Sequence, residues 1–514
     1  MILQHLSASL RSTKQHFFQA ALSLIFLPYD AFVSLDAIFR ALWRMLISRR
    51  NLLEWAPSNQ IDSQAGDRLI NSFRRMWFAP TLAMASIMIL LASHPIALIA
   101  AAPFLLAWLI APVIAWRISQ PQMRVEVRLH DGQAIFLYRL ARKIWAYYET
   151  LVGPEDNWLP PDNIQERPIA VVAHRTSPTN IGLALLANLS AYDFAYISGG
   201  QLLERSSNTL RTMAAMERHR GHFYNWYDTQ TLKPLLPMYI STVDSGNLAG
   251  HLLTLRPGLL MLIDQPIINP RLISGIDDTF KVFQDLAGAT SQMQLAQFQV
   301  LLDSAHVARP TTLSACHACL QQLVAGAENL VTGIDQKESF HLAWWAAALL
   351  RQCRAMYDEL LFLAPWSSWM GSLGENLNLA KLDSIPTLRA LVELETYWLD
   401  ENAKALPEDT LKSGNEEVQG VGEMLALGSL RATARIKEIE NLALQAAEFA
   451  QMDCGFLHDN ATHLMTIGYA VAEQRCDSSC YDLLASEARL CTFVMIAQGQ
   501  LPQESWFALG RQLT

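Results

Sequence analysis

The residues best suited to chemistry in this 514-residue chain lie first in the stretch 219–252. An aromatic pair and three polar residues that follow it are the candidates for binding: Trp226, Tyr227, Asp228, Asp244 and Asn247. Flat rings stack on the C–H faces of sugars, while carboxylates and amides bind the hydroxyl groups. One interpretation is therefore a sugar-binding cleft. An aromatic turn in the core, followed by a capped helix, explains the same residues equally well.

A second candidate group precedes this stretch, at residues 175–182. Ser177, Pro178 and Asn180 directly precede an apolar segment, which is typical of a capped helix start. Arg175 stands just before the cap and is free to bind either a ligand hydroxyl or a buried carboxylate. We therefore count Arg175 and Asn180 as candidate substrate-binding residues, with helix capping as the structural alternative.

A third group lies near the C-terminus, where Tyr481, Asp482 and Glu487 stand in an apolar run. Asp482 is suited to cap a helix. A carboxyl group in apolar surroundings has its pKa raised by desolvation, so Glu487 is a candidate general acid/base. The alternative is a structural ion pair between Glu487 and Arg489 or Arg175.

Composition and motifs narrow the function classes. The net charge of −9 argues against nucleic acid as a partner, because phosphate backbones are bound by basic surfaces. The seven cysteines are scattered, and Cys316 and Cys319 form a Cys-x-x-Cys pair without a second pair at zinc-site spacing. The chain has no Walker loop, dinucleotide-binding glycine motif or nucleophile elbow. We therefore expect no metal and no cofactor.

The clearest physical signal is an uncharged apolar stretch of 41 residues, Met76–Trp116. One helix crosses a bilayer in about 20 residues, so this stretch is long enough for two. Pro95 lies near its middle, and we expect a transmembrane hairpin over residues 76–116. Arginines such as Arg75 and Arg117 flank both ends and place them on the cytoplasmic side. Residues 1–75 are expected to form interfacial or membrane helices. A buried hairpin in a soluble protein is the alternative.

Beyond the hairpin, the pattern indicates a helical protein. Residues 117–170 are polar and rich in proline and Asx residues, which predicts a linker and an ordered loop. From residue 171 onward, apolar segments at helical spacing alternate with short polar breaks, and the part from about 284 to 451 is almost wholly helical in pattern. The best candidate for a linker within it is Glu401–Glu417.

Several of these motifs together resemble the central region of bacterial cyclic β-1,2-glucan synthases. The matching strings are RTSPTNIG (Arg175–Gly182), GHFYNWYDT (Gly221–Thr229), STVDSGNLAGHL (Ser241–Leu252), YDLLASEARL (Tyr481–Leu490) and EDNWLPP (Glu155–Pro161). They occur in the right order, and the upstream apolar hairpin also resembles that family.

This resemblance implies the all-α class: a transmembrane helical hairpin, then an incomplete (α/α)6 toroid-like, glucoamylase-like domain over residues 171–514 with a helical insertion at about 284–451. In that family a membrane glycosyltransferase polymerises glucose, and the central domain cyclises the product by transglycosylation. The chain would begin after the transferase's catalytic part and end at Thr514 inside the central domain. Glu487 would match the acid/base, with its partner carboxylate beyond Thr514. We therefore expect little catalysis by this chain alone.

The implied partners are β-1,2-glucan, a lipid bilayer and a companion chain carrying the rest of the synthase. The implied location is the bacterial inner (cytoplasmic) membrane, with several membrane passes and the main domain in the cytoplasm. Two other hypotheses remain open. One is a non-catalytic remnant that still binds glucan, and the other is a helical membrane adaptor that uses residues 284–451 for protein contacts.

Overall fold

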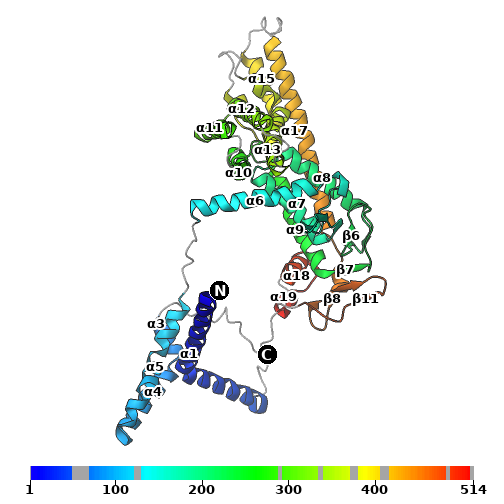
Figure 1. The fold of residues 1–514 in the computed structure, drawn as a ribbon. Helices are drawn as coiled ribbons and strands as arrows, with labels where there is room; N and C mark the ends of the chain where they lie inside the picture. The colour runs from blue at the N-terminus through cyan, green and yellow to red at the C-terminus, as the bar shows by residue number, and fades with distance from the viewer. Residues whose placement is uncertain are drawn as a thin grey trace. The chain divides into compact units, whose positions relative to one another are not determined.

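The computed structural model describes residues 2–48, 69–120, 129–287, 292–333, 340–370, 380–405, 416–481 and 487–509. It divides into two compact units, residues 1–128 and 129–514, each of which is described by itself. The described residues are mainly helical and the strands have only two or three residues each, so the predicted all-α class is confirmed (Figure 1).

The first unit consists of apolar helices: α1 (Ile2–Trp43), the π-helical turn η1 (Arg44–Ser48), α3 (Leu69–Arg75), α4 (Phe78–Ser93) and α5 (Ala97–Ser119). Helices α4 and α5 pack against each other across a short turn, as the hairpin prediction requires. Among the described residues, two stretches are long and apolar enough to cross a membrane, His16–Ser48 and Ala97–Ser119. Helix α4 alone has 16 residues, and it makes a third span only if it forms one with α3, from which it is bent by 69°. The part of residues 1–75 expected to be interfacial is thus also long enough to span.

The second unit begins with a helix where the sequence pattern predicts a linker. Helix α6 (Asp131–Leu151) occupies much of residues 117–170, and a 3-10 turn, η2 (Pro154–Asp156), follows it. Its buried face includes Trp145 but also Arg142, whose Nε donates to Thr279 Oγ1 at 2.7 Å and whose Nη2 donates to Glu149 at 2.9 Å. The prediction of irregular structure was wrong here because an arginine on the buried face breaks the apolar period that marks a helix.

The core of the second unit forms around α9 (Thr242–Met261). Helices α7 (Pro178–Asp193), α17 (Glu416–Phe449) and α18 (Ala488–Ala497) all pack on α9, and α8 (Gly199–Ala215) packs on α7 and α17. Small residues allow this close packing. A Cβ at Gly246 of α9 would overlap the backbone and Cβ of Cys491 in α18, and one at Gly182 of α7 would overlap the ring of His251 in α9.

A helical subregion continues from this core. Its members are α10 (Leu272–Ala287), α11 (Gln292–Ala308), α12 (Leu313–Thr332), α13 (Phe340–Leu363), the 3-10 turn η3 (Pro365–Ser368), α14 (Ala380–Asp383) and α15 (Leu388–Ala405). Helix α17 packs on α15 and α13 and also on α8 and α9, so it joins this subregion to the core (Figure 1). The predicted helical character of residues 284–451 is confirmed for the described part. The expected linker Glu401–Glu417 is helical to Ala405 and from Glu416, and residues 406–415 between them lie outside the described residues.

Most of the short strands pair with a neighbour in the sequence, and two of the pairs join loops that are distant in it. The strands are β1 (Ile164–Gln165), β2 (Val171–Val172), β3 (Arg175–Thr176), β4 (Arg218–His219), β5 (His222–Phe223), β6 (Tyr227–Asp228), β7 (Tyr239–Ser241), β8 (His458–Asp459), β9 (Leu464–Met465), β10 (Gly468–Ala470) and β11 (Arg475–Cys476). Strand β3 pairs antiparallel with β6, and β7 pairs with β10, whose other neighbour is β11. The loops before α7, before α9 and before α18 are therefore held together, and a 3-10 turn, η4 (Gly455–Leu457), and helix α19 (Glu504–Ala508) complete the unit.

Candidate functional site

Asp244 lies in the first turn of α9, where polar side chains from two other segments converge on it. Ser241 caps this helix and its Oγ accepts from the Asp244 amide at 3.3 Å. Thr179, in the first turn of α7, donates its hydroxyl to Asp244 Oδ1 at 2.6 Å and accepts from Asn247 Nδ2 at 3.2 Å. The close packing of α7 on α9 thus brings two helix N-termini to one carboxylate.

The aromatic stretch supplies the second partner of Asp244. With its amide oriented to satisfy both neighbours, Asn225 donates to Asp244 Oδ2 at 3.0 Å and accepts from the indole nitrogen of Trp226 at 3.2 Å. Both carboxylate oxygens of Asp244 are therefore hydrogen-bonded, and Trp226 is connected to them through one amide. The Trp226 ring is half-buried, so part of it faces solvent.

Arg175 lies against the same ring. Its guanidinium carbon stands 4.9 Å from the centre of the Trp226 ring, and its Nη2 donates to Asp162 Oδ2 at 3.0 Å. Asn180 donates to the other Asp162 oxygen at 3.4 Å. The pairing of β3 with β6 sets this arrangement, because Arg175 lies in β3 and Trp226 directly precedes β6.

These contacts form one connected set, which we call the Asp244 cluster: Asp162, Arg175, Thr179, Asn180, Asn225, Trp226, Asp244 and Asn247. It presents a ring face, carboxylates, amides and a guanidinium fork, which are the groups that bind a polyhydroxylated ligand. Five members were predicted as binding residues: Arg175, Asn180, Trp226, Asp244 and Asn247. The sequence analysis did not select Asp162, Thr179 and Asn225, because only the fold shows that their side chains turn toward the others.

Tyr481 interacts electrostatically with this cluster and with Glu487. Burial raises the pKa of the Tyr481 phenol, and the negative charges of Asp244 and Glu487 add to the increase. Glu487 immediately precedes α18 and is exposed, so the apolar surroundings expected for it are not present among the described residues. The reason is that α18 buries one face, which includes Ala488, Cys491 and Met495, and the Glu487 side chain is not part of that face. Asp482 lies outside the described residues.

Two of the predicted binding residues have structural roles instead. The Tyr227 ring is fully buried, and its hydroxyl donates to the Glu217 carbonyl at 2.6 Å and accepts from the Tyr224 amide at 2.8 Å. Asp228 accepts from the amide and hydroxyl of Thr231 at 2.7 and 2.9 Å, and these backbone and side-chain hydrogen bonds lower the pKa of its carboxyl group. Tyr227 belongs to the core and Asp228 closes a turn, as the alternative interpretation of the aromatic stretch expects for these two residues.

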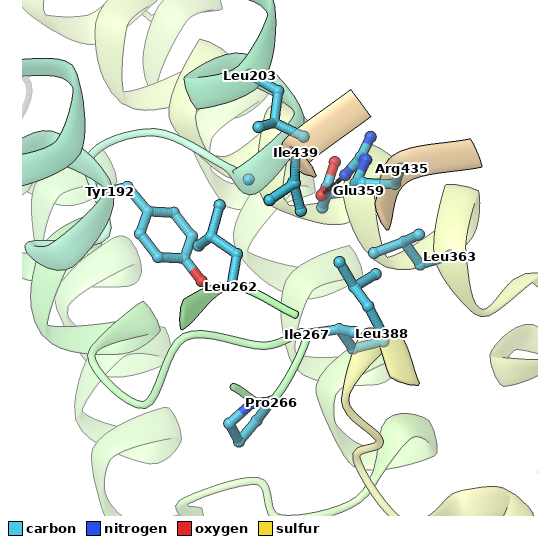
Figure 2. A pocket seen from close by; sticks show the side chains of 11 residues that line it. Tyr192, Leu203, Leu262, Pro266, Ile267, Glu359, Leu363, Leu388, Arg435 and Ile439 are labelled. Carbon is cyan, nitrogen blue, oxygen red and sulfur yellow. Dashed lines mark hydrogen bonds and ion pairs between the residues drawn. The ribbon is translucent and has the colours of Figure 1, made fainter. Parts of the chain in front are cut away.

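Two pockets among the described residues are lined by none of the cluster residues. Figure 2 shows a pocket of about 30 Å³, lined by Tyr192, Glu359 and Arg435 among others, in which the carboxylate of Glu359 faces the guanidinium of Arg435. That volume suits a water molecule and not a sugar. A wider pocket of about 720 Å³ is lined by apolar residues together with His306 and Arg309.

The Cys-x-x-Cys pair lies on α12. Burial raises the pKa of Cys316 to about 12, which opposes the thiolate form that a metal ligand needs. In the part of the chain that the structure describes, no group of three or more His, Cys, Asp or Glu side chains is placed to hold a metal ion.

Comparison with known proteins gives one strong sequence match. The chain is 32% identical over 512 residues to the cyclic beta-(1,2)-glucan synthase NdvB of Rhizobium meliloti (strain 1021). The match covers 99% of this chain and 16% of that protein, so the chain spans about a sixth of the length of its relative. The resemblance predicted from the motifs is confirmed over nearly the whole chain. No family model matches.

Among solved structures, a candidate glucoamylase from Bacteroides fragilis NCTC 9343 is similar over 32% of this chain and 38% of that chain. Its sequence identity is 16% and its TM-score is 0.23, which is too low to support an argument about this fold.

Proposed function

We propose that this chain is a membrane-anchored part of a cyclic β-1,2-glucan synthase and that the Asp244 cluster binds the glucan. The observation that carries the proposal is the 32% identity to such a synthase over 512 residues. The geometry adds support, because most residues of the Asp244 cluster come from the sequence motifs that resemble the synthase family. In the fold, hydrogen bonds and ring stacking join these motifs into one group. In this proposal, helices α7 to α10 with α17 and α18 form part of an (α/α)6 glucoamylase-like domain.

The cluster is suited to hold a pyranose chain. Arg175 stacks on Trp226 and fixes the indole ring, while the exposed part of the ring offers an apolar surface to sugar C–H groups. The Asp162, Asp244 and Asn180 side chains offer acceptors and donors for hydroxyl groups. A glucan bound here would replace water on groups that the fold already orients, which lowers the entropic cost of binding.

For transglycosylation we assign Glu487 as the acid/base. Glycoside chemistry uses two carboxyl groups that flank the scissile bond. We assign the second carboxylate to a part of the synthase outside the 512 matched residues. Glu487 is exposed in the structure, not enclosed by apolar side chains. This exposure favours a second candidate function, glucan binding without catalysis by the isolated chain.

The membrane location is part of the same proposal. Two stretches long and apolar enough to cross a membrane precede the helical unit, and Arg74, Arg75 and Arg117 flank the hairpin. By the positive-inside rule both hairpin ends lie on the cytoplasmic side. We therefore propose a multi-pass protein of the bacterial inner membrane with the helical unit in the cytoplasm.

Titration of the purified full chain in detergent with linear β-1,2-glucan tests the binding function. The Trp226→Ala variant should lose binding, whereas Trp344→Ala should keep it, because Arg351 stacks on Trp344 at 5.4 Å in an equivalent arrangement away from the cluster. Equal affinity of both variants and the unchanged chain would overturn the assignment of the cluster.

A product assay separates the two candidate functions. Cyclic or transferred products that form from linear glucan and vanish in Glu487→Gln would refute the binding-only function. Binding without any product would favour it.

A further inference from the structure

Helix α6 carries a row of large apolar side chains on its solvent side. Phe136, Leu140 and Ile144 are 63%, 42% and 55% exposed, Leu137 is also exposed, and so is Leu129, which lies just before the helix begins. At 3.6 residues per turn, positions 136, 140 and 144 follow one another along a single stripe. We call these five residues the α6 face. An apolar row of this kind on a soluble surface usually marks an interaction site.

The opposite side of α6 is fixed to the body of the helical unit. Helix α6 packs on α10 and α7, Arg142 is buried between Tyr196 and Trp345, and Arg139 binds Asp285 at 2.7 Å. These contacts hold α6 as a rigid, amphipathic element, so its outer stripe cannot turn inward to cover itself. An external surface must supply the partner.

The chain itself indicates which surface this is. Helix α5, which is long and apolar enough to cross a membrane, ends at Ser119, and only residues 120–130 separate it from α6. Eleven residues are thus the whole connection between a candidate membrane span and α6. The intervening sequence carries Arg124 and Arg128, and Lys143 is exposed beside the stripe. Apolar residues bordered by basic ones are typical of helices that lie in the interface of an anionic membrane.

We propose that the α6 face lies in the interfacial layer of the membrane that α5 crosses, with its phenylalanine and leucine side chains among the upper acyl carbons. The helix then fixes how the helical unit is held against the bilayer. This inference does not depend on what the Asp244 cluster binds, since it involves neither its residues nor its chemistry.

Site-specific photocrosslinking tests this inference on the full chain, reconstituted in nanodiscs of phosphatidylethanolamine and phosphatidylglycerol. p-Benzoylphenylalanine replaces one residue at a time, and adducts are identified by mass spectrometry. Probes at Phe136 and Ile144 should give lipid adducts. A probe at Phe104 in α5 is the positive control, and one at Val307 in α11, which is 86% exposed, is the matched exposed control.

Each other outcome overturns the proposal. Adducts from Phe136 to a second copy of the chain or to another protein would show a protein interface. No lipid adduct at Phe136 while Phe104 gives one would show that the face is not in the membrane, and equal adducts at Val307 would show non-specific contact. In a further variant, Leu140→Gln with Ile144→Gln should lower the lipid adduct at Phe136 several-fold, and an unchanged yield would contradict the role of the stripe.

Discussion

The buried ion pair between Glu359 and Arg435 should be a main anchor between the helical subregion and the core. Glu359 lies on α13 and Arg435 on α17, and their side chains are only 12% and 13% exposed. The Gly200 amide, in the first turn of α8, donates to Glu359 Oε1 at 3.1 Å. Burial, and then the charge of Glu359, raise the pKa of Tyr192 to about 12, which agrees with a carboxylate in a poorly solvated pocket (Figure 2).

Removing one charge leaves the other buried without a partner. Glu359→Gln keeps an acceptor for the Gly200 amide but leaves the Arg435 charge without a partner, which should lower the free energy of unfolding by about 3–5 kcal/mol. Arg435→Met should lower it by a similar amount, because it leaves the Glu359 carboxylate buried without its cation. The double variant Glu359→Gln with Arg435→Met keeps the Gly200 hydrogen bond and removes both charges, so it should lie within about 1 kcal/mol of the unchanged chain.

Native-state hydrogen exchange is the assay, because it reports local opening without assuming that both units unfold together. Peptides from α8 and α13 should exchange roughly 100- to 5,000-fold faster in each single variant and return close to the original rate in the double variant. The control is Glu328→Gln, which breaks a pair with Arg354 that is about half exposed and should change exchange by less than tenfold. Single variants that behave like Glu328→Gln would refute the claim that the Glu359–Arg435 pair is desolvated.

Three further predictions follow from other parts of the chain. Burial, opposed by Arg271, raises the pKa of Asp278 to about 6, so its favourable contribution to folding is complete below about pH 4 and is lost as the pH rises through 6. Asp278→Asn removes this pH-dependent loss. Between pH 4 and 7.5 its free energy of unfolding should therefore rise by up to about 3 kcal/mol relative to that of the unchanged chain. A difference that stays the same at every pH in denaturant titrations would contradict this. Gly246→Ala should push α18 away from α9, lower the free energy of unfolding by about 1–3 kcal/mol and weaken glucan binding. Gly132→Ala is the control, because a Cβ there meets nothing within 4 Å. It should change neither the stability nor the binding in the same thermal scans and titrations. Gly200→Ala would place a methyl group 2.7 Å from Glu359 Oε2, so its exchange profile at α13 should resemble that of Glu359→Gln, and an unchanged profile would count against the close packing there.

The features that could be predicted from the sequence are those that depend on local pattern. The 41 uncharged residues at 76–116 and the turn near Pro95 follow from composition and proline chemistry. The start of α7 follows from the Ser177 cap, whose side chain accepts from the Asn180 amide. Such signals need no knowledge of distant residues.

What could not be predicted depends on contacts across the fold. Asn225 and Asp244 form a hydrogen bond only because the fold brings the region before β6 next to the start of α9. Neither sequence motif carries a signal for this contact. Tyr227 was predicted to stack on a sugar because it is aromatic. Its ring is buried in the core instead, where its hydroxyl donates to the Glu217 carbonyl, a contact that the local sequence does not reveal. Glu487 was expected to be enclosed because its neighbours in the sequence are apolar, and the orientation of α18 exposes it instead.

The most direct test of the central claim is a hydrogen-exchange footprint of linear β-1,2-glucan on the full chain. Glucan at saturating concentration should slow exchange at the starts of α7 and α9, residues 178–182 and 242–247, and leave α12 unchanged. The same protection should be absent in Trp226→Ala and present in Trp344→Ala. Protection confined to α11–α13, or no protection anywhere, would contradict the assignment of the Asp244 cluster as the glucan site.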